Sequence, residues 1–212
     1  MSEASDTDFE LLEAWRGGDD RAGRELFARH FDSIYRFFRS KVEDAAEDLT
    51  QQTFMGAVKG RERYRGDASF RTYLYTIARN RLYTHIRDRQ RRDAVVEIGQ
   101  HSVADLGLAS PTRQLADREE HKLLLAAMRH LPLEMQVALE LHYWEGLSVR
   151  EIAIVIDTPE GTIKRRLQRA RQRLDELISQ LAESDALRRS TAANFDQWAE
   201  ELRARLNPSA DS

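Results

Sequence analysis

The sequence predicts an all-α protein, with two small helical domains joined by a flexible linker, a helix-turn-helix in the second domain and a short C-terminal helical extension. Two observations predict this class. Apolar residues recur at helical spacing in both halves of the chain. Between Asp93 and Arg113 that periodicity fails over a length greater than that of ordinary loops within a domain. We therefore expect one domain at 1–92, the linker at 93–113, the second domain at 114–180 and the extension at 181–212.

The first domain is expected to contain four helices. The pair Gly17-Gly18 separates the first helix from the second. Ser69 caps the fourth helix, because its hydroxyl oxygen can accept a free backbone N–H. The expected helices are Phe9–Trp15, Asp20–Lys41, Asp44–Lys59 and a long helix that runs from Ser69 toward Arg92, after a polar loop at Gly60–Asp67.

The second domain is expected to begin with helices at Gln114–His130 and Leu133–Trp144. The segment Ser148–Glu151 is a capping box, in which the Ser and Glu side chains satisfy each other's free N–H groups. A turn follows at Asp157, with Thr158 as the cap and Pro159 as the first residue of a long final helix. The helices on either side of this turn form the predicted helix-turn-helix.

The extension is expected to hold one more helix. Asn194 can cap a short amphipathic segment through Phe195, Trp198, Leu202 and Leu206. An isolated helix of this length is marginal in water, so its apolar face must dock on another surface. The sequence leaves open whether that surface belongs to this protein or to a partner.

Composition excludes several classes of protein. The 212 residues include no cysteine and carry a net charge of -3, so disulfides and thiolate metal sites are ruled out. No apolar run approaches the ~20 residues of a membrane span. The start of the chain is acidic and polar, which is not the pattern of a secretory signal. We expect a cytoplasmic protein without membrane insertion.

Nothing in the sequence predicts an enzyme. The six histidines form no ligand spacing, no Gly-rich phosphate loop occurs, and no Ser, His and acid set follows a nucleophile elbow. We therefore expect no catalytic residues, no metal, no cofactor and no small-molecule substrate.

Two basic clusters point to nucleic acid. Residues 79–92 carry six arginines against one acid, and residues 161–175 carry six basic side chains against one acid. The helix at Phe70–Arg81 interleaves aromatic and basic side chains, a pattern suited to stacking on unpaired bases while holding phosphate. The second cluster lies on the second helix of the helix-turn-helix, which is the form that enters a major groove. A protein that recognises a promoter and helps to melt it needs both modules.

Particular side chains of the first module suit strand opening. Asp67 can accept from an exocyclic amine, Asn80 offers a donor and an acceptor to a base edge, and an aromatic ring can stack on an extruded base. Tyr73 and Tyr75 are two apart on a helix and cannot share one face, so we assign Tyr73 to DNA. The candidates for the downstream promoter element and melting are Tyr64, Arg65, Asp67, Phe70, Arg71, Tyr73, Arg79, Asn80, Arg81 and Arg87.

The second module suits duplex DNA. Arg or Lys can engage guanine and Gln can engage adenine in the major groove, while free N–H groups at the start of a helix favour a phosphate. Ile163 and Leu167 belong to the apolar stripe and are expected to be core. The candidate readers of duplex DNA are Pro159, Gly161, Thr162, Lys164, Arg165, Gln168 and Arg169.

The third helix carries an acidic and amide face that suits a basic partner surface. Four polar side chains fall on adjacent turns, and an aromatic ring packs behind or beside them. These candidates are Glu47, Asp48, Gln51, Gln52 and Phe54.

These motifs together resemble a known family. Glu47–Phe54 resembles the core-polymerase-binding helix of bacterial sigma factors, Tyr64–Leu74 looks like their promoter-melting segment, and Leu131–Leu174 resembles their upstream-element-binding domain. The short two-domain layout is similar to the extracytoplasmic-function (ECF) subgroup. The resemblance implies that the partners are bacterial core RNA polymerase, through the coiled-coil clamp of its largest subunit, and promoter DNA. Whether an anti-sigma factor is a further partner is left open.

Two other classes stay open from the residues alone. A stand-alone helix-turn-helix regulator would bind duplex DNA without core enzyme, and would not need the aromatic-basic helix or the acidic helix. A helical adaptor that uses these faces only for protein would not need two arginine clusters. The combination of motifs favours a promoter-specificity subunit of RNA polymerase.

Overall fold

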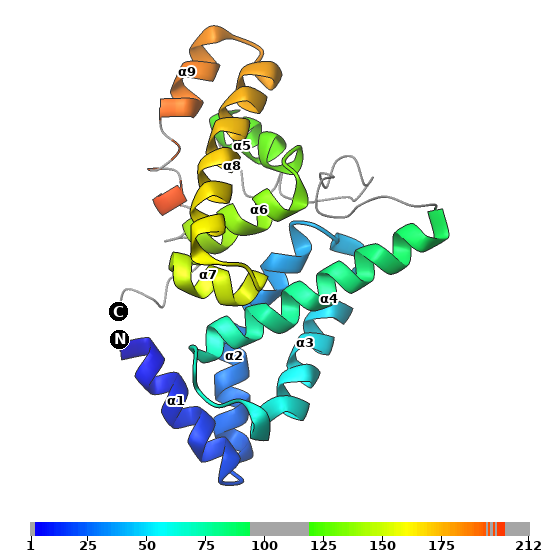
Figure 1. Cartoon of the computed structure of the whole chain (residues 1–212), viewed down its shortest axis with the longest axis vertical. Coiled ribbons are helices and arrows are strands. Elements are labelled where there is room, and N and C mark those ends of the chain that lie inside the picture. Colours follow the sequence, from blue (N-terminus) through cyan, green and yellow to red (C-terminus); the bar gives the residue numbers. More distant parts are fainter. Residues whose placement is uncertain (1–2, 94–118, 194, 196, 198, 202–212) are drawn as a thin grey trace.

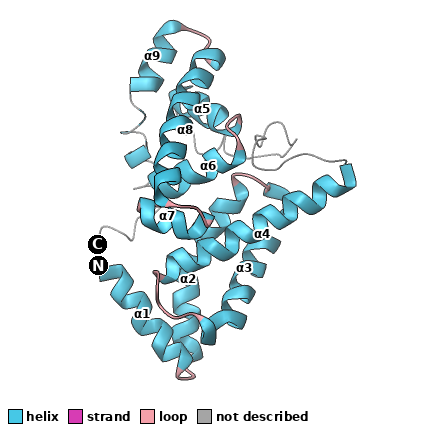
Figure 2. Ribbon diagram, in the orientation of Figure 1, coloured by secondary structure: helices cyan, strands magenta, loops and turns pink. Residues whose placement is uncertain are grey.

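The computed structural model describes residues 3–93, 119–193, 195, 197 and 199–201. Over these ranges the regular structure is helical and contains no strand (Figure 2), which confirms the all-α class. Residues 94–113 of the predicted linker and the predicted helix start at Gln114 lie outside the described residues.

The N-terminal domain consists of four helices joined by short turns (Figure 1). The helix pair at its start is linked through Gly18, whose φ of 100° is a conformation that favours glycine. Asp19 then caps the second helix by accepting from the N–H groups of the two residues at 21 and 22. The helices are α1 (Glu3–Arg16), α2 (Asp20–Arg39), α3 (Ala46–Gly60) and α4 (Phe70–Asp93), with 3-10 turns η1 (Glu43–Ala45) and η2 (Arg61–Arg63).

The predicted cap of α4 is confirmed. The Ser69 hydroxyl accepts from the Thr72 N–H at 3.2 Å, three residues into the helix. The first helix is longer than the predicted Phe9–Trp15, because it already begins at Glu3.

The C-terminal domain contains α5 (Glu119–Arg129), α6 (Leu133–Leu139), the π-helical turn η4 (Glu140–Trp144), α7 (Val149–Ile156) and α8 (Glu160–Leu181). The sequence predicted one continuous helix up to Trp144. Instead, the Glu145 N–H donates to the Glu140 carbonyl at 3.1 Å, five residues back. Such a widened turn is uncommon and is found mostly at functional positions.

The helix-turn-helix forms as predicted, with one correction at its turn. Ser148 and Glu151 make both hydrogen bonds of the capping box. Asp157 adopts a left-handed conformation with φ 54° and ends α7. The predicted cap at Thr158 is wrong, because its hydroxyl donates backward to the Ile156 carbonyl at 3.4 Å, and Pro159 occupies the cap position.

The C-terminal extension docks on its own domain. It contains α9 (Asp185–Ala193), which the sequence did not predict, followed by described helical residues at 195, 197 and 199–201. Phe195 and Ala199 are 3% and 2% exposed and belong to one apolar cluster with residues of α5 and α8. This docking answers, for Phe195, the question that the sequence left open. Asn194, Trp198, Leu202 and Leu206 lie outside the described residues.

The two domains pack against each other. Figure 1 shows α7 lying along α4, and these two helices are in contact. One apolar cluster combines core residues of α2, α3 and α4 with buried side chains of the other domain, among them Ile152, Val155 and Ile156 of α7. The helix with the aromatic-basic pattern is therefore covered along one side by the helix-turn-helix.

Candidate functional site

The acidic face predicted on the third helix lies on the exposed side of α3. Glu47, Asp48 and Gln51 are exposed, and the Gln52 amide donates to the Asp48 carboxylate at 2.8 Å. Both acids lie in the first turn of α3, where the positive end of the helix dipole stabilises negative charge. The surface presents carboxylates and amides to solvent, which suits contact with a basic partner.

An apolar patch continues this face. Phe54 lies behind the polar residues, with its ring centroid 4.9 Å from Phe27 and 6.1 Å from Phe31. Phe31 of α2 is 45% exposed, and Met55 and Val58 of α3 are also exposed. Sequence reasoning missed these three side chains. Met55 lies four residues after Gln51, and Val58 lies three residues after Met55. This helical spacing places both on the side of α3 that carries the acidic face, so it could have predicted them.

An aromatic cluster forms where the loop meets α4. The ring centroids of Tyr64 and Tyr73 are 4.8 Å apart. The Phe70 centroid lies 6.1 Å from that of Tyr64 and 6.2 Å from that of Tyr73. Phe70 is buried, whereas the two tyrosines are half-buried. Burial raises the pKa of Tyr64 to about 12, and its hydroxyl donates to the Ala68 carbonyl.

The loop before α4 is fixed at its start and exposed at its tip. Arg16 of α1 donates from its guanidinium to the Tyr64 carbonyl. At the tip, Gly66 has a φ of 77°, a conformation that favours glycine. Arg65 and Asp67 on either side of it are exposed, so both candidate side chains are available to a ligand.

The structure divides the α4 candidates between two faces of the helix. One set is open to solvent: Asn80, Arg81 and Arg87. Arg71 points the other way, and its guanidinium donates to the Glu145 carboxylate of the C-terminal domain at 3.0 Å. Arg79 is half-buried, with its guanidinium 4.3 Å from the ring centroid of Tyr83. Tyr75 is fully buried and Tyr73 is not, so of the two tyrosines Tyr75 is the core residue.

The start of α8 exposes most of the predicted duplex readers. Thr162 is half-buried, and Ile163 is fully buried, as expected for the apolar stripe. Leu167 is half-buried and packs against both apolar clusters. The exposed candidates are Pro159, Gly161, Lys164, Arg165, Gln168 and Arg169.

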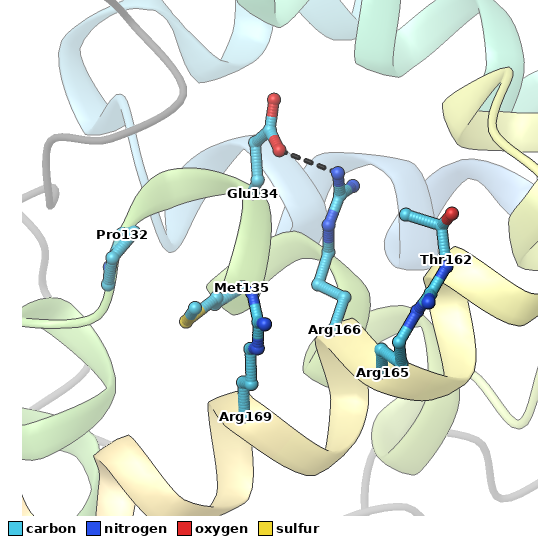
Figure 3. A pocket seen from close by; sticks show the side chains of 7 residues that line it. All are labelled: Pro132, Glu134, Met135, Thr162, Arg165, Arg166 and Arg169. Atoms are coloured by element: carbon cyan, nitrogen blue, oxygen red, sulfur yellow. Dashed lines mark ion pairs between the residues drawn. The ribbon is translucent and has the colours of Figure 1, made fainter.

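A cleft of about 620 Å³ lies between α6 and α8. Figure 3 shows Arg166 reaching toward Glu134 and Arg169 lying beside Met135. Arg166 is held in place by that acid at 2.7 Å, whereas Arg165 and Arg169 are exposed. Sequence reasoning did not single out Arg166, because its partner comes from another helix. The lining residues are Pro132, Glu134, Met135, Thr162, Arg165, Arg166 and Arg169.

The described part of the chain holds no group of three or more His, Cys, Asp or Glu side chains placed to bind a metal ion. Over the same residues, no helix is both long enough and apolar enough to span a bilayer.

Comparison with known proteins places the chain in a family. Two family models match the chain: Sigma-70 region 2 over residues 26–92 and Sigma-70, region 4 over residues 121–174. The RNA polymerase sigma-H factor of Pseudomonas aeruginosa is 33% identical over 185 residues, which cover 82% of this chain and 95% of that protein. The chain belongs to the sigma-70 family of RNA polymerase sigma factors. A second relative of this sigma factor, the ECF RNA polymerase sigma-E factor of Escherichia coli K12, is 28% identical over 183 residues, which cover 82% of this chain and 96% of that protein.

These matches identify an ECF sigma factor, and with it a promoter-specificity subunit of bacterial RNA polymerase. The alternative of a stand-alone helix-turn-helix regulator is excluded, since region 2 is present beside region 4. Sigma factors are not a family of enzymes.

Two solved structures share the fold of this sigma factor. RpoE of Bartonella quintana, solved in complex with the anti-sigma factor NepR, has a TM-score of 0.57 and 26% identity, covering 74% of this chain and 96% of that one. CnrH, solved in complex with the cytosolic domain of CnrY, has a TM-score of 0.62 and 22% identity, and the match covers 83% of this chain and 99% of that one. The likeness to CnrH is one of fold.

Proposed function

We propose that this sigma factor divides its work among three surfaces. The exposed α3 face, residues 47–52 with Phe54 behind it, binds core RNA polymerase. The loop at 64–67 and the open face of α4 receive the downstream promoter element and the separated strand. The start of α8 reads the upstream element. The observation that carries the proposal is the α3 face, whose carboxylates are exposed to solvent on a helix braced by the contacts of the buried Phe54 ring with Phe27 and Phe31.

The proposal for opened DNA rests on adjacent aromatic and cationic side chains. Tyr64 and Tyr73 offer half-buried rings for stacking, and Asn80, Arg81 and Arg87 follow along the exposed side of the same helix. Base stacking on aromatic side chains contributes about 1–3 kcal/mol per base, which is of the size needed to offset unstacking of a base. Phe70 is buried and supports the two tyrosines from below rather than stacking on a base itself.

The proposal for duplex DNA divides the arginines of α8 by role. Arg165 and Arg169 are exposed beside the cleft and suit guanine or phosphate. Arg166 forms an ion pair with Glu134 and helps to shape the cleft instead of contacting a base. Pro159 and Gly161 belong to the helix start, where free N–H groups suit a phosphate.

The proposal further places this protein in the cytoplasm, where core polymerase is found, and assigns it no catalytic group of its own. An anti-sigma factor is included as a partner on the ground that RpoE was solved with NepR.

The test compares two variants with opposite expected defects. Glu47→Lys combined with Asp48→Lys should weaken affinity for sigma-free core polymerase at least about 30-fold, since losing one partner of a desolvated interfacial charge pair costs about 2–5 kcal/mol. Arg169→Ala should leave that affinity unchanged but reduce transcription from a promoter that the wild-type holoenzyme selects from genomic fragments.

The control is Glu183→Lys combined with Asp185→Lys, the same charge change at exposed acids outside the proposed surface. Helical content by circular dichroism should stay the same in all three variants. Unchanged core affinity after charge reversal at α3 would refute the assignment of that face. Equal loss of core binding and promoter use in Arg169→Ala would refute the division between α3 and α8.

A further inference from the structure

The end of α1 contacts the segment that leads into the exposed loop at 64–67. The Arg16 guanidinium donates from Nε and Nη2 to the Arg61 carbonyl, at 3.2 and 2.9 Å, and from Nη2 to the Tyr64 carbonyl. Its Nη1 is held by the Glu13 carboxylate at 2.6 Å. Figure 1 shows this segment, between α3 and α4, passing beside α1. We call the hydrogen bonds of Arg16 to these two carbonyls the α1–loop contact.

The two carbonyls lie where the chain leaves a helical segment. α3 continues directly into the 3-10 turn η2, which ends at Arg63. The last four carbonyls of a helix receive no N–H from within it. A basic side chain near such an end donates to these carbonyls and meets the negative end of the helix dipole. Arg16 supplies this side chain from another helix, 45 and 48 residues away in the chain.

A second contact runs in the opposite direction and fixes the end of α1. Arg61 donates from Nη1 to the Trp15 carbonyl at 3.3 Å, and its guanidinium lies 4.9 Å from the centroid of the Trp15 ring. Trp15 is 6% exposed and packs edge-on against Phe27 of α2, with ring centroids 5.1 Å apart. Arg16 therefore follows a residue that is anchored in the core of the N-terminal domain.

Tyr64 connects this anchored position to the loop. Its carbonyl accepts from Arg16 while its hydroxyl donates to the Ala68 carbonyl, so it joins the start of the loop to its end. Arg65 and Asp67 lie between these two joined ends and are exposed. Because a loop closed in this way has fewer conformations to lose on binding, its side chains are preorganised for a ligand.

We infer that Arg16 is a positioning residue for promoter reading: through Tyr64 it fixes where Arg65 and Asp67 lie against the downstream element, without contacting DNA itself. The inference rests on the proposed role of the loop at 64–67. Side chains that recognise a ligand must be held close to the productive geometry by the residues behind them. The Sigma-70 region 2 match begins at residue 26, so this positioning residue lies in a helix that precedes the matched residues.

The experiment measures base discrimination by the holoenzyme reconstituted with the full-length chain. The templates are a promoter that the wild-type holoenzyme selects from genomic fragments and its single-base variants in the downstream and upstream elements. Arg16→Met removes the guanidinium but keeps an apolar stem, and Arg16→Lys keeps the charge without the planar fork that reaches two carbonyls. Arg24→Met, at an exposed arginine of α2, is the matched control. Core affinity and thermal unfolding are measured for every variant.

The effect should be confined to one promoter element. A base pair that is read correctly is favoured about 5- to 100-fold over a wrong one. In Arg16→Met this factor should fall at least about fivefold for the downstream element, because a loosely held loop reads bases poorly, and Arg16→Lys should lose part of it. Discrimination at the upstream element and core affinity should stay at the wild-type level, as should all measurements in Arg24→Met.

Two outcomes would overturn the inference. The first is unchanged downstream discrimination in Arg16→Met. The second is an equal loss at both promoter elements, which is the result expected of a protein that is only destabilised. If Arg16→Met does not fold, the same two outcomes are judged on Arg16→Lys.

Asp67→Ala separates this inference from the proposed function. It removes a side chain of the loop itself and leaves the α1–loop contact in place. If downstream discrimination falls in Asp67→Ala but not in Arg16→Met, the loop reads DNA without help from Arg16, and only the inference fails. If discrimination falls in neither variant, the loop does not read the downstream element, and the proposed function of this surface fails as well.

Discussion

Replacing Phe195 by alanine should release the C-terminal extension while leaving the rest of the protein folded. The Phe195 ring is nearly perpendicular to Tyr143, with centroids 4.9 Å apart and an interplanar angle of 87°. The Arg171 guanidinium lies 4.0 Å from the Phe195 centroid and 5.6 Å from that of Tyr143. One buried side chain is therefore the main described anchor of the segment after α9.

The expected magnitude follows from these contacts. Full burial of a Phe side chain contributes about 1.5–3 kcal/mol, an edge-to-face aromatic pair about 0.5–1.5 kcal/mol, and a partly desolvated cation–π contact about 0.5–2 kcal/mol. The total agrees with the ~3–5 kcal/mol typical of Phe→Ala in a core. A short helix has almost no stability alone, so the segment stays docked only through its contacts with the rest of the domain. Losing contacts of this size should therefore release it.

Hydrogen–deuterium exchange over residues 195–201, the segment after α9, is the assay. Phe195→Ala should bring amide exchange in this segment close to that of an unstructured peptide, whereas Phe195→Leu, which keeps an apolar side chain, should retain most of the protection. The global free energy of unfolding should fall no further in Phe195→Ala than in a chain ending at Ala182. A larger fall, or protection that survives the alanine substitution, would refute the idea that the extension docks as a separable unit.

Two further predictions concern the loop and the helix-turn-helix. A Cβ at position 60 would lie 2.1 Å from the Tyr73 hydroxyl oxygen, so Gly60→Ala should lower the free energy of unfolding by about 1–3 kcal/mol through overpacking. Denaturant unfolding should show a smaller loss in a Tyr73→Phe background. An equal loss in both backgrounds would count against the clash. For Glu151, burial alone would raise the pKa, but hydrogen bonds from Ser148, Thr72 and Ser69 outweigh it and hold the pKa below its usual value. The stability that this carboxylate contributes is therefore present above the ordinary pKa of about 4.3 and lost as pH falls through the lower folded value. Chemical unfolding should show a deficit in Glu151→Gln at pH 7 that shrinks below about pH 4, and a deficit independent of pH would contradict the linkage.

Local signals in the sequence were sufficient for most of the helices. The capping box at Ser148–Glu151 and the cap at Ser69 were both predicted, because each depends on residues no more than three positions apart. The missed helix α9 carries a weaker signal. The Ser184 hydroxyl accepts from the Leu187 N–H at 3.2 Å, which is an N-cap that the sequence already displays. Its apolar periodicity is short, so α9 depends on packing against α5 and α8 that periodicity cannot reveal.

The sequence pattern named candidate side chains for the site but did not reveal which of them are accessible. Periodicity assigned Tyr75 to the core, where it is buried. It did not distinguish Arg71 from Arg81, although the first meets Glu145 and the second faces solvent. The difference arises because Arg71 contacts Glu145, which is 74 residues away in the chain. Glu145 follows a π-helical turn that no local sequence pattern predicted. Long-range ion pairs of this kind are invisible to motif reading, since each partner alone resembles an ordinary charged surface residue.

The packing of the two domains leaves the surfaces of this sigma factor unequally accessible. The α3 face and the exposed side of α8 are open to solvent, whereas the Arg71 guanidinium is engaged by the Glu145 carboxylate of the other domain. Because this ion pair must be broken before Arg71 can meet a new partner, a ligand gains less from Arg71 than from an exposed arginine such as Arg81. Accessibility therefore favours Arg81 over Arg71 as a contact of the proposed DNA surface.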